Sequence, residues 1–392
     1  MASQLAKLLV VLACLLSLPG FANDAPAQRG LRVSPAQILE LPVHKPRVLK
    51  LDLTRDANDI WDRIRRGFAM PDLDSELVVE RQAHYLSRPG FLKQVFERGA
   101  LYLYHIVDEL ERRGLPTELA LLPMVESNYD PLAYSRSRAS GLWQFMPATG
   151  RNFNLTQDKW IDERRDVIAS TNAALDYLEY VYEMHGDWHL ALASYNWGEG
   201  AVARALKRNR DQGLPTEYAH LRMPTETRNY VPKLQALKNL VAQPELFDFE
   251  LPHVPNQRHF VTVEAPQGLD LATAARLAEM PIDEFIALNP AYNRPVVALR
   301  GRSLVVPVDR AEPFRARLGE LAEGGKRWKT YQLKRGENLA AVAKRFGLSL
   351  AQLHQVNGLT ARSRIVPGHT LLVPDGVDPG AAVEAARALH GR

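Results

Sequence analysis

The chain has 392 residues, of which 46% are apolar and 24% are charged, and its net charge is +4. This composition is ordinary for a globular protein and excludes a disordered or fibrous chain, while the length predicts two or three domains. The small positive charge suits an anionic cell wall as well as nucleic acid. Because no dense run of lysine and arginine with interleaved aromatic residues is present, we expect no nucleic-acid partner.

The N-terminus is typical of a secretory signal peptide over residues 1–22. Lys7 precedes an apolar run from Leu8 to Leu18, and small residues end at Ala22, after which we expect cleavage. The run is too short to span a bilayer. The only cysteine, Cys14, lies in a stretch that loosely resembles a lipoprotein box, so lipidation there is an alternative. After cleavage the mature chain would contain no disulfide, thiol nucleophile or thiolate metal site.

Helical periodicity dominates the chain up to about residue 250. Residues 23–88 are interpreted as a linker followed by short helices over 56–68 and 72–85. From residue 89 to 250 helix follows helix, and a bundle with one core is expected. The predicted helices are Phe91–Arg113, Glu118–Glu126, Arg164–His185, Trp188–Tyr195, Ala201–Lys207 and Thr225–Val241.

The C-terminal part changes character and predicts a small β-α-α-β module over residues 327–376. Strands are expected at Lys329–Leu333 and Thr370–Val373. Asn338 can cap the first helix, and Ser349 with Gln352 forms a capping box that opens the second. Residues 377–392 are left as a C-terminal tail.

This module has an internal copy at a constant offset, which predicts a second, diverged module over residues 258–310. Leu304-Val305-Val306-Pro307 also echoes Leu371-Leu372-Val373-Pro374. The residues that match in both helices are Leu271, Ala275, Phe285, Leu288 and Asn289 in the first copy and Leu339, Ala343, Leu353, Val356 and Asn357 in the second.

The residues that suggest chemistry lie around Glu126-Ser127 and the segment Gly141–Pro147. Glu126 follows the apolar stretch Leu121–Val125, so burial should raise its pKa and keep it protonated near neutrality. A protonated carboxyl of this kind can act as a general acid, as cleavage of a glycosidic bond requires. The alternative is a partly exposed glutamate at a helix end.

Three blocks closely resemble the lysozyme-like lytic transglycosylases, and within them the membrane-bound lytic transglycosylase D group. These blocks are Glu126-Ser127 with Gly141–Pro147, Ala191–Gly200, and Glu226–Val231. The resemblance implies an α+β multidomain protein with a mainly α-helical lysozyme-like catalytic domain over residues 89–250. The small βααβ modules that follow resemble LysM modules, which bind N-acetylglucosamine polymers. The module over 258–310 could equally be a spacer without affinity for sugar.

The resemblance also assigns roles to residues of this chain. Glu126 is implied to be the catalytic acid and base, and a tyrosine hydroxyl beside it is implied at Tyr195. The implied substrate-binding residues are Ser127, Ser135, Gln144, Met146, Tyr195, Asn196, Glu226 and Tyr230. From the residues alone, Tyr195 and Met146 could also be core side chains, Glu226 could serve only the first turn of its helix, and Trp143 is better explained by packing.

The chemistry implied is cleavage of the MurNAc-GlcNAc bond of peptidoglycan without water, leaving a 1,6-anhydro sugar. A hydrolase usually needs two carboxylates, and Asp130, the nearest second one, is better explained as capping a turn. We expect no cofactor, peptidoglycan strands as the partner, and a periplasmic protein with possible outer-membrane association. A hydrolytic lysozyme of the same fold and a non-catalytic wall-binding scaffold remain alternatives.

Two patterns imitate other sites. His185 and His189 have the spacing of helical metal ligands, but Gly186 is expected to end the helix between them and no third ligand is evident. Gly198–Ala203 imitates a dinucleotide-binding fingerprint, yet it follows a predicted helix and not a strand. Neither pattern is therefore interpreted as a site.

Overall fold

The computed structural model describes residues 58–323, 327–360 and 362–390 of the chain. The predicted signal peptide, Cys14 and most of the predicted linker lie outside these residues. None of the helices in the described ranges is long and apolar enough to cross a membrane.

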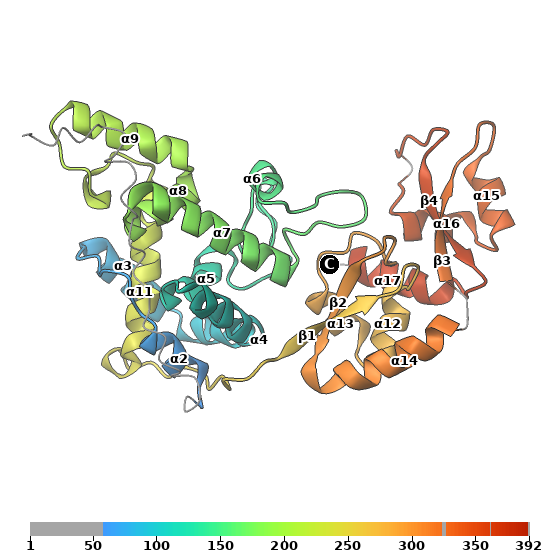
Figure 1. Cartoon of the computed structure of the whole chain (residues 1–392), viewed down its shortest axis with the longest axis horizontal. Coiled ribbons are helices and arrows are strands. Elements are labelled where there is room, and N and C mark those ends of the chain that lie inside the picture. The colour runs from blue at the N-terminus through green and yellow to red at the C-terminus, as the bar shows by residue number, and fades with distance from the viewer. Residues whose placement is uncertain (1–57, 324–326, 361, 391–392) are drawn as a thin grey trace, which may run out of the picture. The chain divides into compact units, whose positions relative to one another are not determined.

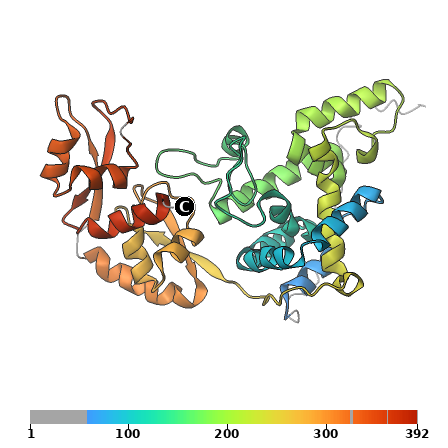
Figure 2. The same cartoon turned by 180° about the vertical axis from the view of Figure 1, so that it is seen from behind.

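Residues 58 to about 250 form a helical domain without a regular sheet, and all named strands follow it in the chain (Figures 1 and 2). Its helices are α2 (Ile60–Arg66), α3 (Glu76–Leu86), α4 (Pro89–Arg113), α5 (Leu122–Ser127), α6 (Pro147–Asn152), α7 (Val167–His185), α8 (Trp188–Trp197), α9 (Glu199–Asp211), α10 (Thr225–Arg228) and α11 (Tyr230–Ala242). Short 3₁₀ turns cover Thr117–Leu121, Tyr218–His220 and Pro244–Phe247. The predicted helical bundle is therefore confirmed.

Two predicted helices are each divided in the structure, and one helix was not predicted. The segment expected as one helix over 118–126 is a 3₁₀ turn followed by α5, with Pro123 in the first turn of α5. Proline has no N–H to donate to the preceding turn, so the chain starts a new helix there. The segment over 225–241 divides at Asn229 into α10 and α11. Helix α6 is only six residues long, too short for a periodic pattern to reveal.

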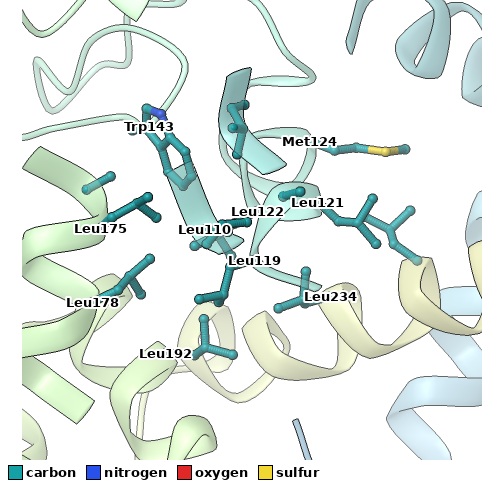
Figure 3. Close-up of a cluster of buried hydrophobic side chains, with 14 of the residues drawn as sticks. Leu110, Leu119, Leu121, Leu122, Met124, Trp143, Leu175, Leu178, Leu192 and Leu234 are labelled. Atoms are coloured by element: carbon teal, nitrogen blue, oxygen red, sulfur yellow. The ribbon is translucent and has the colours of Figure 1, made fainter. Parts of the chain in front are cut away.

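The core of the helical domain surrounds α5. Helix α4 contributes apolar side chains at spacings of three and four residues, from Leu92 to Leu110. Figure 3 shows leucines from the 3₁₀ turn, α7, α8 and α11 gathered around this short helix, with the indole of Trp143 reaching into the same cluster. Trp143 is fully buried and donates from Nε1 to the Thr171 hydroxyl at 3.0 Å, which agrees with the packing role expected for it.

Both predicted βααβ modules are present. In the first, β1 (Phe260–Ala265) pairs antiparallel with β2 (Arg302–Pro307), and α12 (Leu271–Leu277) and α13 (Ile282–Leu288) lie between them in sequence. In the second, β3 (Arg327–Gln332) pairs antiparallel with β4 (Thr370–Asp375), and α15 (Leu339–Arg345) and α16 (Leu350–Asn357) lie between them. The Asn338 cap and the Ser349–Gln352 capping box form as expected.

One buried asparagine makes the same hydrogen bonds in each module. Asn357 donates from Nδ2 to the carbonyls of Leu353 and Leu372 and accepts from the Leu372 amide. Asn289 bonds Phe285 and Val305 in the same pattern. Each asparagine therefore joins the end of the second helix to the closing strand, and the repeat seen in the sequence is also a repeat of contacts.

Two further helices were missed by sequence reasoning, α14 (Ala311–Glu323) and α17 (Gly380–His390). The second lies in the segment expected to be a tail. Its Ala385 is buried in the core of the first module, whereas its Ala382 and Val383 are buried in the core of the second. The burial of this helix depends on residues far away in the sequence.

We expect Asn357→Ala to destabilise the second module by about 2–4 kcal/mol, because it removes the side-chain partner of the Leu372 amide and carbonyl on the closing strand. Thermal unfolding of the full chain, followed by amide exchange in the module, measures the effect. The exposed Lys344→Ala on α15 is the matched control and should leave the midpoint unchanged. Equal midpoints for the two variants would contradict this role of Asn357.

Candidate active site

A cleft of about 600 Å³ opens on the helical domain beside Glu126. Side chains from α5, the segment 135–149, α7, α8, the start of α9, α10 and α11 all contribute to it. Its lining consists of Val125, Glu126, Ser135, Ser137, Ala139, Gln144, Phe145, Met146, Thr149, Tyr177, Tyr195, Asn196, Trp197, Gly198, Glu199, Glu226, Tyr230 and Lys233.

The structure brings the predicted site residues together in this cleft, with one exception. The residues that line it are Glu126, Ser135, Gln144, Met146, Tyr195, Asn196, Glu226 and Tyr230. Ser127 does not line it. Its buried hydroxyl lies 3.1 Å from the Pro123 carbonyl and 2.9 Å from the Leu142 carbonyl. Ser127 thus ties α5 to the segment 141–147 and positions the neighbours of the cleft.

The Glu126 carboxyl is enclosed by protein, although part of the side chain remains open to the cleft. Burial raises its pKa to about 7, and the negative charge of Glu226 acts in the same direction. A hydrogen bond from the Tyr230 hydroxyl to Oε1 lowers the pKa, as does the charge of Lys233. Burial has the largest effect, so a large share of Glu126 carries a proton near neutral pH.

The tyrosine hydroxyl that donates a hydrogen bond to Glu126 is that of Tyr230, while Tyr195, which the resemblance implied beside Glu126, lines the same cleft. The Tyr195 hydroxyl donates to the Trp143 carbonyl at 2.9 Å. Burial raises the pKa of both tyrosines well above the usual range, so both hydroxyls keep their protons. Tyr195 therefore holds the segment 141–147 against α8, and Tyr230 supplies the hydrogen bond to the carboxyl.

Asn196 is oriented by a neighbour on α10. The Thr227 hydroxyl donates to Asn196 Oδ1 at 2.8 Å. With that oxygen occupied, the Nδ2 amide is the group left to donate to a molecule in the cleft. Asn196 can therefore recognise a carbonyl oxygen.

One wall of the cleft is the segment 135–146, and backbone contacts hold it in place. Gly141 has φ +85°, and a Cβ there would lie 1.9 Å from the Arg164 carbonyl oxygen. The Arg164 side chain is buried and donates to the carbonyls of Arg138 at 2.7 Å and Phe145 at 3.1 Å. Glycine is required at position 141 because the backbone of residue 164 passes so close.

Sequence reasoning missed several polar or aromatic residues of the cleft, among them Tyr177, Trp197, Glu199 and Lys233. The Tyr177 hydroxyl donates to Glu199 Oε2 at 2.8 Å, and Glu199 is a third carboxylate in the cleft besides Glu126 and Glu226. Glu199 lay in a segment that was set aside as an imitation of a nucleotide-binding motif. Lys233 follows Tyr230 by three residues on one helix and could have been found from that spacing.

The remaining sequence interpretations concern residues outside the cleft. Asp130 accepts from the Leu132 amide at 2.9 Å and so caps a turn, as expected. Gly186 ends α7 in the left-handed region, between His185 and His189. The His185 ring contacts the Ser194 hydroxyl, and the His189 ring contacts the Pro71 carbonyl. Among the described residues no group of three or more potential ligands could hold a metal ion.

Comparison with known proteins agrees with this geometry. Residues 104–215 match the transglycosylase SLT domain, residues 259–323 match the LysM-like domain of lytic transglycosylase MltD, and residues 331–374 match the LysM domain. The chain is 33% identical over 331 residues to the membrane-bound lytic murein transglycosylase D of Escherichia coli K12, covering 81% of this chain and 73% of that protein. The chain belongs to the lytic murein transglycosylase D family. The protein of the same name from Escherichia coli O6:H1 is similar to the same extent.

We expect Gly141→Ala to destabilise this transglycosylase by on the order of 3 kcal/mol, since the new methyl would collide with the Arg164 carbonyl. The matched control is Gly213→Ala. Gly213 also has a positive φ, +66°, but nothing lies within 4 Å of its Cβ position. Only the backbone strain of about 1 kcal/mol applies there. Thermal midpoints of the two variants should differ clearly, and equal midpoints would contradict the close approach.

The raised pKa of Glu126 predicts a pH-dependent cost to stability. The Glu126 carboxyl has a pKa of about 7 in the folded state and 4.5 in the unfolded chain. The free energy of unfolding therefore falls as the pH rises from about 4.5 to about 7, and the full cost applies above pH 7. At about 1.4 kcal/mol per pKa unit, Glu126→Gln should stabilise the transglycosylase by up to about 3 kcal/mol at pH 8 and by less than about 1 kcal/mol at pH 5. Denaturant unfolding at both pH values tests this. Glu97→Gln, on the exposed surface of α4, should show no such difference.

Proposed function

We propose that this transglycosylase cleaves the β-1,4 bond between MurNAc and GlcNAc in peptidoglycan without water and leaves 1,6-anhydro-MurNAc ends. Glu126 is the catalytic acid and base. The observation that carries the proposal is a carboxyl held near neutral pKa in a cleft, bonded through one oxygen to Tyr230. Its Oε2 has no hydrogen-bond partner among the residues described and is the atom that can hold the transferable proton.

The reaction proceeds in two proton transfers. Glu126 first gives its proton to the glycosidic oxygen, the bond from that oxygen to C1 of MurNAc breaks, and GlcNAc leaves as an alcohol. The carbonyl oxygen of the sugar's own N-acetyl group stabilises the positive charge at C1. The Glu126 carboxylate then takes the proton of the C6 hydroxyl, whose oxygen bonds C1. The carboxyl is restored, and no water is consumed.

Other cleft residues bind and orient the sugars in this proposal. Asn196, whose Nδ2 is left free by Thr227, suits the N-acetyl carbonyl. The glycan contacts Ser135, Gln144, Met146 and Glu226 along the cleft. Tyr195 holds the segment 141–147 in place through its hydrogen bond to the Trp143 carbonyl. Tyr230 keeps the carboxyl in the orientation that presents Oε2 to the substrate.

The chain divides into parts with separate tasks. We assign catalysis to residues 89–250, glycan binding to the module over 327–376, and a diverged module to 258–310. The matches to LysM-type domains support this division. Export by residues 1–22 would place the protein in the periplasm, and the relatives' description as membrane-bound is compatible with an attachment there. Lipidation at Cys14 would supply an outer-membrane anchor.

A hydrolytic reaction is the second candidate, and one observation favours it. Glu199 and Glu226 bring two more carboxylates to the cleft that holds Glu126. A second carboxylate could activate water or form a covalent intermediate. The products distinguish the two reactions, since an anhydro end is lighter by one water than a reducing end.

Glu126→Gln should lower glycan cleavage by at least about 10³-fold, because one group performs both proton transfers and general acid catalysis alone contributes roughly 10²–10⁴-fold. Turnover is measured on purified sacculi, and mass spectrometry of the wild-type products should find anhydro ends. Glu97→Gln is the control and should retain full activity. Near-normal turnover by Glu126→Gln would contradict the assignment of the acid. Reducing ends alone would identify a hydrolase, and no cleavage by the wild type would leave a binding scaffold.

A further inference from the structure

The cleft contains a cation that the proposed reaction does not use. Of the residues that line it, Lys233 is the only one with a cationic side chain, and the side chain is partly buried. It forms no salt bridge with any residue in the described part of the chain. Lys233 therefore lines the space in which the substrate would lie without a carboxylate bonded to its ammonium group.

A second lysine on the same helix, in contrast, is paired with carboxylates. Lys238 lies five residues further along α11, and its ammonium group bonds Asp72 at 2.7 Å and lies 3.4 Å from Glu118. That lysine has two carboxylates within reach and serves to join α11 to the N-terminal segment. Lys233 follows Tyr230 by three residues, so the two side chains share one face of the helix, and that face forms the cleft.

The effect of Lys233 on the pKa of Glu126 does not explain why a lysine lies at this position. Its positive charge lowers the pKa of Glu126, against the effects of burial and of Glu226. A general acid that must hold its proton near pH 7 would be better served by a neutral side chain at this position. The positive charge of Lys233 therefore weakens the hold of Glu126 on its proton, and binding of another group would explain why a lysine lies there.

Peptidoglycan offers a partner of the right charge. The muramoyl sugar carries a lactyl group whose carboxyl is either free or joined to a peptide, and the peptide itself bears free carboxylates. A lysine ammonium group binds such a carboxylate through charge-assisted hydrogen bonds, which gain strength where water is partly excluded. The cleft has no other cation to perform this task.

We propose that Lys233 forms a carboxylate subsite, which selects glycan strands whose muramoyl sugar carries an anionic substituent. This proposal rests on the function proposed above, because it assumes that the muramoyl sugar lies in this cleft. Lys233 is a specificity-determining residue in it and takes no part in the proton transfers. The shared ligand chemistry is a carboxylate, on the lactyl group or on the peptide.

The test compares three short glycans of equal length. One has free lactyl carboxyls, one has the same carboxyls converted to neutral methylamides, and one carries peptides with free carboxylates. The full-length proteins are the wild type, Lys233→Met, Lys233→Arg and the control Lys93→Met, which removes an exposed charge on α4. The values of kcat and KM are measured separately, at low and high salt.

We expect Lys233→Met to lose roughly 10–100-fold in kcat/KM on the carboxylate-bearing glycans, mainly through KM, in line with a charge-assisted hydrogen bond. The loss should shrink at high salt, Lys233→Arg should recover most of the activity, and Lys93→Met should match the wild type. On the neutral glycan Lys233→Met should show no rise in KM, and any change in kcat there, which reports the effect of the charge on Glu126, should be common to all three glycans. Which of the two anionic glycans shows the loss identifies the source of the carboxylate.

Equal losses on neutral and anionic glycans would overturn the proposal, because Lys233 would then act on Glu126 or on the fold. No loss on either anionic glycan would overturn it as well. Binding to Glu126→Gln, measured by calorimetry with and without Lys233→Met, separates this proposal from the proposed function. A failed reaction mechanism would leave the preference for anionic glycans in binding intact, whereas a failed subsite would abolish it.

Discussion

The hydrogen bond from Tyr230 to Glu126 joins α11 to α5 through two residues that lie 104 positions apart in the chain, and the cleft depends on it. Burial works against ionisation of the carboxyl, while the tyrosine hydroxyl partly offsets that effect. The result is a carboxyl that changes its charge within the physiological range. A stronger partner would make it a permanent anion, and full enclosure without one would make it permanently neutral.

The helical core and the segment 135–146 keep Glu126 and Tyr230 in fixed positions and so keep the pKa of Glu126 constant. The indole of Trp143 is buried and reaches into the core (Figure 3). Its carbonyl accepts a hydrogen bond from Tyr195, and the carbonyl of the adjacent Leu142 accepts one from the Ser127 hydroxyl. The same few residues therefore pack the core and orient the site. Arg164 adds an anchor from outside the wall by bonding two of its carbonyls. The segment 135–147 therefore contributes both to the packing of the core and to the shape of the cleft.

Much of this arrangement could be predicted from the sequence. Periodicity, caps and a constant offset identified the helical bundle and both βααβ modules, because those signals are local. The apolar neighbours of Glu126 made it a candidate, and the resemblance of the surrounding blocks to lytic transglycosylases selected it over a partly exposed glutamate at a helix end. The sequence did not indicate that the hydroxyl of Tyr230 donates to the carboxyl, or that Glu199 and Lys233 enter the cleft. These placements result from how distant helices pack, which local patterns do not encode.

The position of α17 has a consequence for synthesis. Its Ala385 belongs to the core of the first module, whose strands are made long before it. While the chain is still growing, the first module must leave part of its apolar surface uncovered until this helix emerges and docks. The same helix then also supplies Ala382 to the second core. A truncation near residue 380 would thus resemble a halted translation product, with two unfinished cores, and become a substrate for quality-control proteases.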